Sequence, residues 1–124
     1  MAKSWGSLIA KWQKRILRDP GWKIRIDEDV EIEEPATAIV VTDRFVYREA
    51  AIKLRPKLPP DNRIACHEVC HIAVAALCWS ARNAVEETAD TVETQLLVEA
   101  WLLQSEEVTA ELLTRAFLVA YGED

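Results

Sequence analysis

The sequence predicts an α+β fold, because three β-rich segments lie between an N-terminal helical pattern and a second half in which helical patterns dominate. Half of the 124 residues are hydrophobic and 29% are charged, a balance typical of globular chains. This length suits one domain with its own core. We therefore expect a single domain over residues 1–124. Its elements are an N-terminal helix, a small three-stranded sheet with an edge strand, a buried helix and two C-terminal helices.

The first element is predicted to be an amphipathic helix over residues 4–17. Lysine and arginine fill one face, and large apolar side chains recur at helical spacing on the other. We expect the apolar face to pack against the core, which is far more common than a membrane or partner surface. An Asp-Pro-Gly turn at residues 19–21 ends the helix. The apolar face consists of Trp5, Leu8, Ile9, Trp12, Ile16 and Leu17.

Three segments have the composition of strands. They are residues 22–26 and 51–55, which alternate apolar and charged side chains, and residues 37–47, which are rich in β-branched and aromatic residues. An acidic loop separates the segment over residues 22–26 from the one over residues 37–47. Lys53, Arg55 and the following Pro56 suit an exposed sheet edge. The strand from Ala51 to Arg55 is therefore expected to be the edge strand.

The next helix starts after Pro59 and Pro60, because proline is favoured in a first helical turn. Residues 67–71 read His-Glu-Val-Cys-His, which is the H-E-x-x-H pattern of zinc metallopeptidases. Residues 72–79 are apolar all round, so this helix is expected to be the buried centre of the fold.

This motif predicts a zinc site. His67 and His71 lie just over one helical turn apart, so their rings stack on one face and can meet at a single tetrahedral Zn²⁺. Glu68 lies beside that face, close enough to touch a metal-bound water. Histidines on a buried helix are costly without a partner, and a metal ion is a suitable one.

Two more helices complete the prediction. Residues 80–83 are expected to break the buried helix, and a second long helix follows over residues 84–104. Ser105 would cap a last helix over residues 106–121, which Gly122 terminates.

A third zinc ligand has to be Asp, Glu or Cys, because the chain has no other histidine. The helix over residues 84–104 offers five acidic residues, and Glu93 lies nearest the middle of its apolar stripe. We select Glu93, although the spacing leaves the others open. These are Glu86, Glu87, Asp90 and Glu99.

The motif followed by Glu93 resembles the gluzincin pattern, in which the helix after the motif supplies a glutamate ligand. Over residues 38–103 the chain looks most like minigluzincins and short phage-encoded metallopeptidases, and more distantly like ImmA/IrrE proteases. The resemblance implies a zincin-like fold and a zinc-dependent peptidase. His67, His71 and Glu93 would hold the metal, and Glu68 would be the general base. The edge strand from Ala51 to Arg55 would bind an extended peptide by strand addition.

In that mechanism, Zn²⁺ lowers the pKa of its bound water. Glu68 takes a proton from this water and returns it to the leaving amine. A catalytically inactive or structural zinc-binding domain is the alternative, because Cys66, Cys70 and Cys78 share the helix and Cys70 is placed to join the ion. Haem attachment through the C-x-x-x-C-H spacing and a metal-free interaction protein are further alternatives.

Charge and cysteine content point to the compartment and exclude some partners. The net charge of −6 argues against nucleic-acid binding, which needs a basic face. The sequence has neither a membrane-spanning apolar run nor a signal-peptide core. The cysteines are odd in number, and Cys66 and Cys70 lie one turn apart, which suits reduced thiols. We expect a cytoplasmic protein.

Overall fold

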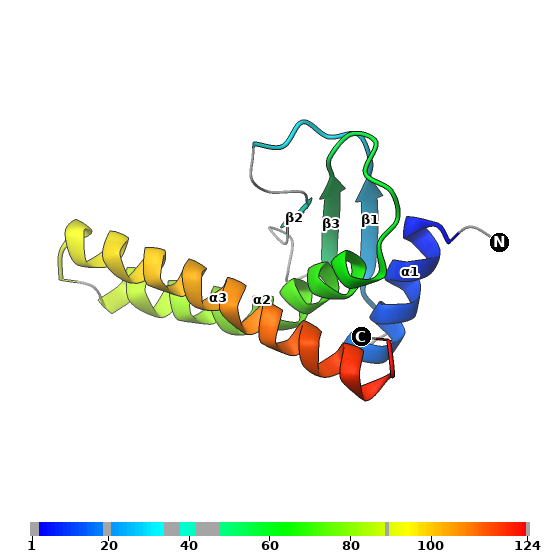
Figure 1. Ribbon diagram of the computed structural model, residues 1–124. Helices are drawn as coiled ribbons and strands as arrows, with labels where there is room; N and C mark the ends of the chain where they lie inside the picture. The colour runs from blue at the N-terminus through cyan, green and yellow to red at the C-terminus, as the bar shows by residue number, and fades with distance from the viewer. Residues whose placement is uncertain (1–2, 19–20, 34–37, 42–47, 89, 124) are drawn as a thin grey trace.

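The computed structural model describes residues 3–18, 21–33, 38–41, 48–88 and 90–123. It confirms the α+β class: a small sheet packs against helices, and a long helical hairpin extends to one side (Figure 1). The elements in order are α1 (Trp5–Trp12), the π-helical η1 (Gln13–Leu17), β1 (Lys23–Asp27), β2 (Ala38–Val41), β3 (Glu49–Leu54), α2 (Asn62–Thr88) and α3 (Val92–Ala120).

The N-terminal helix forms where the sequence predicts it. Ser4 caps α1 by accepting a hydrogen bond from the backbone of Ser7, and the Ser7 hydroxyl accepts one from the backbone N–H of Ser4. The helix widens into the π-helical η1 in its last turn and stops at Arg18, whose backbone is left-handed. Its apolar face is buried against the core, as expected. The buried residues of α1 are Trp5, Leu8, Ile9 and Trp12.

β3 lies in the centre of the sheet, between a parallel β1 and an antiparallel β2. The expected edge position of residues 51–55 is therefore wrong, because β3 is hydrogen-bonded on both sides and an extended peptide cannot add to it. Lys53 and Arg55 suggested an edge, but Ala50 to Ile52 are all buried, as a central strand requires. Of the predicted strand over residues 37–47, the structure describes β2; residues 37 and 42–47 lie outside the described residues.

α2 and α3 form a continuous antiparallel hairpin, so the two predicted helix breaks are wrong (Figure 1). α2 runs through residues 80–83, which contain neither glycine nor proline. Ser105 lies inside α3 rather than at a cap. The chain reverses between the end of α2 at Thr88 and the start of α3 at Val92, and Thr91 caps α3 by accepting a hydrogen bond from the backbone of Thr94 at 3.1 Å.

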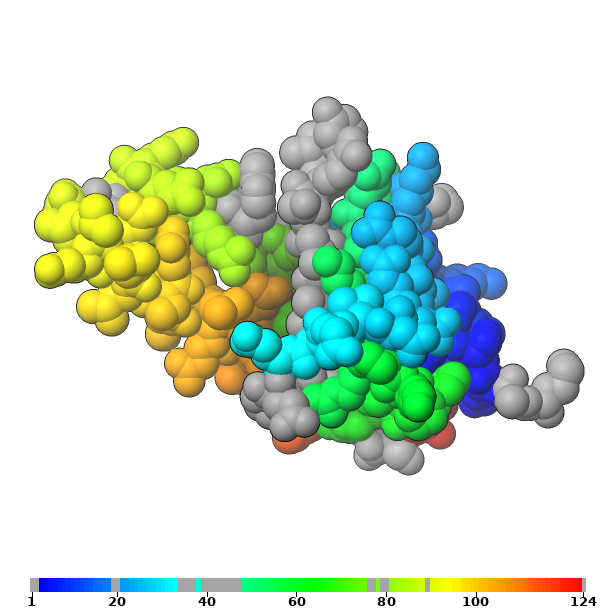
Figure 2. Space-filling view, turned by 90° about the horizontal axis from the view of Figure 1, so that it is seen from above, coloured from blue at the N-terminus to red at the C-terminus, as the bar shows by residue number. Residues whose placement is uncertain are grey.

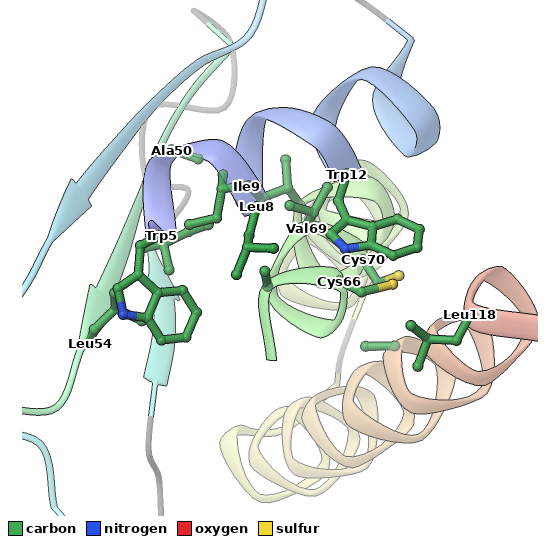
Figure 3. Packing of buried hydrophobic residues seen from close by; sticks show 14 residues of the cluster. Trp5, Leu8, Ile9, Trp12, Ala50, Leu54, Cys66, Val69, Cys70 and Leu118 are labelled. Atoms are coloured by element: carbon green, nitrogen blue, oxygen red, sulfur yellow. The ribbon is translucent and has the colours of Figure 1, made fainter. Parts of the chain in front are cut away.

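The core gathers where the start of α2 meets α1, β3 and the end of α3. Figure 3 shows Cys66 and Cys70 of α2 facing Trp12 and Leu118. Beyond this region the hairpin projects past the sheet, and Ala73 of α2 is already exposed. The expected burial all round residues 72–79 is therefore not found. Among the described residues, none of the helices has the length and apolar character that a membrane crossing would require.

Candidate metal centre

Two imidazoles project from the same side of α2. His67 and His71 lie one turn apart, and their Nε2 atoms approach to 3.2 Å. Their rings meet edge to face, with centroids 4.8 Å apart and planes at 77°. The predicted sharing of one helix face is thus confirmed, and both rings are half-buried.

A carboxylate from α3 completes the group. Oε1 of Glu107 lies 3.0 Å from Nε2 of His67, and Oε2 lies 3.0 Å from Nε2 of His71. Ligand atoms of these three residues all lie within 4.8 Å of one another, close enough to hold a metal ion. Among the described residues, this is the group of acidic, histidine and cysteine side chains that meets that condition.

The other ring nitrogens also face carboxylates from α3. Nδ1 of His67 lies 3.1 Å from Oε2 of Glu111, with the hydroxyl of Thr114 at 3.4 Å. Nδ1 of His71 lies 3.2 Å from Oε1 of Glu106. Metal-binding histidines commonly donate their second N–H to a carboxylate in this way, which fixes both the tautomer and the ring orientation.

Arginines hold these outer carboxylates in turn. Glu111 pairs with Arg63 of α2 and with Arg115 of α3, the latter at 3.3 Å. Glu106 lies 3.7 Å from Arg82. Its hydrogen bond with His71, together with the charges of His71 and Arg82, keeps the pKa of Glu106 below its usual range. Both outer carboxylates are therefore ionised acceptors for the imidazole N–H groups.

This arrangement leaves an excess of acceptors at the centre. When each Nδ1 donates its hydrogen outward, neither Nε2 carries one, and both Nε2 atoms face the two oxygens of Glu107. Acceptors this close need a cation or extra protons between them. A tetrahedral Zn²⁺ with nitrogens at about 2.0–2.1 Å separates two ligand atoms by about 3.3 Å. The two Nε2 atoms, 3.2 Å apart, match that spacing.

Protons are the alternative to a cation, and the surroundings of His71 show how they would be held. Burial acts to lower the pKa of His71. The hydrogen bond with Glu106 and the negative charges of Glu68 and Glu107 outweigh burial and leave that pKa above its usual value. The site is therefore strongly cation-attracting, for a proton or for a metal ion.

Glu68 lies beside the cluster with only 6% of its surface exposed. Burial raises the pKa of its carboxyl group, while the neighbouring His71 and His67 act to lower it. The charge interaction of Glu68 with both imidazoles agrees with the prediction that this glutamate borders the histidine face.

Glu93 is not brought to the histidines. It occupies the first turn of α3, 14 residues before Glu107 (107 − 93 = 14), or about 21 Å along the helix axis. Its place is taken by Glu107. The other candidates are also distant from the group: Glu86 and Glu87 end α2, Asp90 lies in the turn, and Glu99 bonds Gln95 on its own helix.

Glu107 was missed because the hairpin turn was misplaced. In an antiparallel hairpin, residues at equal distances from the turn lie opposite each other. A break at residues 80–83 puts His71 opposite Glu93, whereas the observed reversal between Thr88 and Val92 brings it to Glu107 and Glu106.

The cysteines do not belong to the metal group. Cys66 and Cys70 are fully buried in the core. The hydrogen bond between them, and to a smaller extent burial, raises the pKa of Cys66. All three are free thiols, as expected. The predicted alternative in which Cys70 joins the ion finds no support among the described residues.

Comparisons of the chain with known protein families, curated proteins and solved protein structures give no match. The resemblance to gluzincins therefore stays a prediction, and the case for function comes from the geometry of the site.

Proposed function

We propose that this chain is a zinc-binding domain with peptidase activity, in which His67, His71 and Glu107 hold the ion. The observation that carries the proposal is the meeting of two Nε2 atoms with one carboxylate, while both Nδ1 atoms are occupied by Glu111 and Glu106. Such outward pairing is typical of metal-binding imidazoles, because it fixes the tautomer and the orientation of each ring.

The ligand set favours zinc over harder cations. Two imidazoles and one carboxylate form a borderline-soft set that suits Zn²⁺, whereas Ca²⁺ and Mg²⁺ prefer oxygen ligands. Glu107 is 63% exposed, so the site opens to solvent and leaves room for water or substrate. When bound, Zn²⁺ would supply Lewis acidity and make water a stronger acid.

Glu68 would act as the general base. Its burial raises the pKa of the carboxyl group, which makes it a better proton acceptor near neutrality than an exposed glutamate. It would accept the proton of the attacking water and deliver it to the leaving amine. An extended substrate would add to β1 or β2, since these are the outer strands of the described sheet.

The metal assignment is tested with protein purified without a histidine tag. Wild type should contain about one Zn²⁺ per chain, and Glu107→Gln should bind it far more weakly. Glu93→Gln is the matched control on the same helix and should keep wild-type zinc. Equal zinc in all three proteins would show that Glu107 is not a ligand. No zinc in wild type would contradict the metal assignment itself.

The peptidase assignment is tested with Glu68→Gln and a mixed peptide library analysed by mass spectrometry. We expect wild type to produce cleaved peptides and Glu68→Gln to retain zinc but lose cleavage by about 10²-fold or more. Cleavage by Glu68→Gln at the wild-type rate would rule out its role as base.

A non-catalytic zinc domain is the second candidate, and the burial of Glu68 is the observation that favours it. A base must reach the water that it deprotonates, and Glu68 is only 6% exposed. Wild type that carries full zinc and cleaves no member of the library would establish this second function instead.

A further inference from the structure

α3 carries a row of large apolar side chains on its outer surface. Each of them is between 54% and 73% exposed. We call this row the α3 stripe; it consists of Leu97, Trp101, Val108, Leu112 and Val119.

The stripe is a single line along the helix. Its members are spaced by four, seven, four and seven residues, and at about 100° per residue they fall within an arc of about 60°. α3 turns another side to the core, where Ala110, Thr114 and Leu118 are buried. The stripe therefore plays no part in packing the chain as described.

An exposed row of this size is unusual for an isolated chain. Single exposed apolar residues are common, but contiguous patches beyond a few hundred Å² usually mark an interface. Five side chains that each expose roughly 100 Å² amount to roughly 500 Å². Figure 2 shows that the end of the hairpin where α2 meets α3 stands away from the sheet. On the face in view, no other described segment covers it.

We infer that the α3 stripe is the interface of a homodimer, with a second copy of this chain packed antiparallel across it. The spacing of the last four members is self-complementary: Trp101 and Val119 are symmetric about residue 110 (101 + 119 = 220), and so are Val108 and Leu112 (108 + 112 = 220). A two-fold axis there sets Trp101 beside Val119 of the second copy and Val108 beside Leu112 of the second copy. Isologous interfaces require this kind of matching.

Charge agrees with this register. Arg115 is the charged residue within the arc of the stripe, and its guanidinium already bonds Glu111 at 3.3 Å. The same two-fold axis sets Arg115 opposite Ser105 of the second copy (105 + 115 = 220). No like charges face each other along the stripe, so association carries no electrostatic penalty there.

An interface of this size is typical of weak, transient association. Two stripes bury on the order of 1,000 Å² in total, at the lower end of specific protein interfaces. The matched pairs, from Trp101 to Val119, extend over about 27 Å of helix. We therefore expect a dissociation constant in the micromolar range, about 1–100 µM.

Sedimentation velocity of the full chain, from about 1 to about 200 µM, measures the association directly. Wild type should shift from monomer to dimer across that range. Val108→Lys should stay monomeric, because it places a charge at the centre of the stripe. Thr109→Lys is the matched control: Thr109 is the next exposed residue of α3, about 100° off the line of Val108, and this variant should dimerise like wild type. Circular dichroism confirms that both variants remain folded.

The register is tested by mixing two variants that are each expected to be monomeric. Val108→Lys and Leu112→Glu should associate when combined, because the antiparallel register sets the new lysine beside the new glutamate. A wild type that stays monomeric at the highest concentration would overturn the inference. So would dimers of Val108→Lys, or a mixture that does not associate.

Discussion

Oε1 of Glu106 lies 3.2 Å from Nδ1 of His71, so a carboxylate on α3 fixes the orientation of an imidazole on α2. The pairing turns Nε2 of His71 toward Glu107, which lies 3.0 Å away. Two adjacent glutamates of α3 thus contact the two nitrogens of a single ring. Glu106 positions the imidazole, and Glu107 is placed to bind the same ion.

The first prediction concerns this positioning. Glu106→Gln should weaken Zn²⁺ affinity by about 10–100-fold, the usual effect of losing an outer carboxylate partner, while saturating zinc still gives full occupancy. Competition with a chromogenic chelator measures the affinity. Glu99→Gln is the control, since Glu99 bonds Gln95 on its own helix. Identical affinities for Glu106→Gln and wild type would show that the contact with His71 is incidental.

Metal removal should lower thermal stability. An ion that binds only the folded chain contributes about 2.7 kcal/mol at a concentration 100-fold above its dissociation constant. For a domain of this size, that corresponds to roughly 10 °C in melting temperature. Calorimetry with zinc and with chelator gives the difference. His71→Ala should melt at the same temperature in both conditions; a zinc-dependent shift in that variant would place the stabilising ion elsewhere.

The third prediction uses the salt bridges at the end of the chain. Glu123 pairs with Lys11 and Arg15 of the N-terminal helical segment, and the hydrogen bonds with Lys11 and then Arg15 lower its pKa to about 2. A carboxyl group whose pKa is lower in the folded chain stabilises the fold at pH values above the pKa of the unfolded chain. That contribution is lost as the pH falls toward 2. Glu123→Gln should therefore melt lower than wild type at neutral pH.

The two proteins should converge as the pH is lowered from about 5 toward 2, because wild type then loses the same ion pairs. Partly exposed pairs contribute no more than about 1 kcal/mol each, so the difference at neutral pH is a few degrees. Melting temperatures across this pH range measure it, with Glu33→Gln in an exposed loop as the control. A gap that persists unchanged at low pH would contradict the pairing.

Helix geometry over a single turn was enough to predict that His67 and His71 share a face, so the sequence alone predicted two of the three residues that meet in the cluster. The third residue depended on where the chain reverses, and no glycine or proline marks residues 80–91. The polar residues 80–83 looked like a break, yet each can continue a helix. α2 in fact ends at Thr88, and Thr91 marks the start of α3, which its hydroxyl caps.

The order of the strands was harder to predict for a similar reason. Local composition indicated three strands, but Lys53 and Arg55 could not reveal that β1 pairs with β3 in parallel. That pairing joins segments far apart in the sequence and depends on the packing of α1 and α2 against the sheet. Charged residues such as Lys53 and Arg55 indicate that the strand is partly exposed at those two positions. They do not indicate which strands pair with it.

The continuity of α2 gives the last prediction, in which proline distinguishes the two hairpin geometries. Ala81→Pro would be tolerated if residues 80–83 formed a loop. Inside α2 it removes a hydrogen bond and clashes with the preceding turn, at a cost of about 3 kcal/mol or more. We expect the melting temperature to fall by roughly 10 °C and zinc affinity to drop, because a kink shifts Glu107 away from His71.

Val92→Pro is the matched control at the first position of α3. Thr91 before it is extended, with φ −138° and ψ 157°, which suits a residue before proline. A wild-type melting temperature for Ala81→Pro, or a large loss for Val92→Pro, would mean that the chain reverses near residue 81 and that Glu93 is again a candidate to face the histidines.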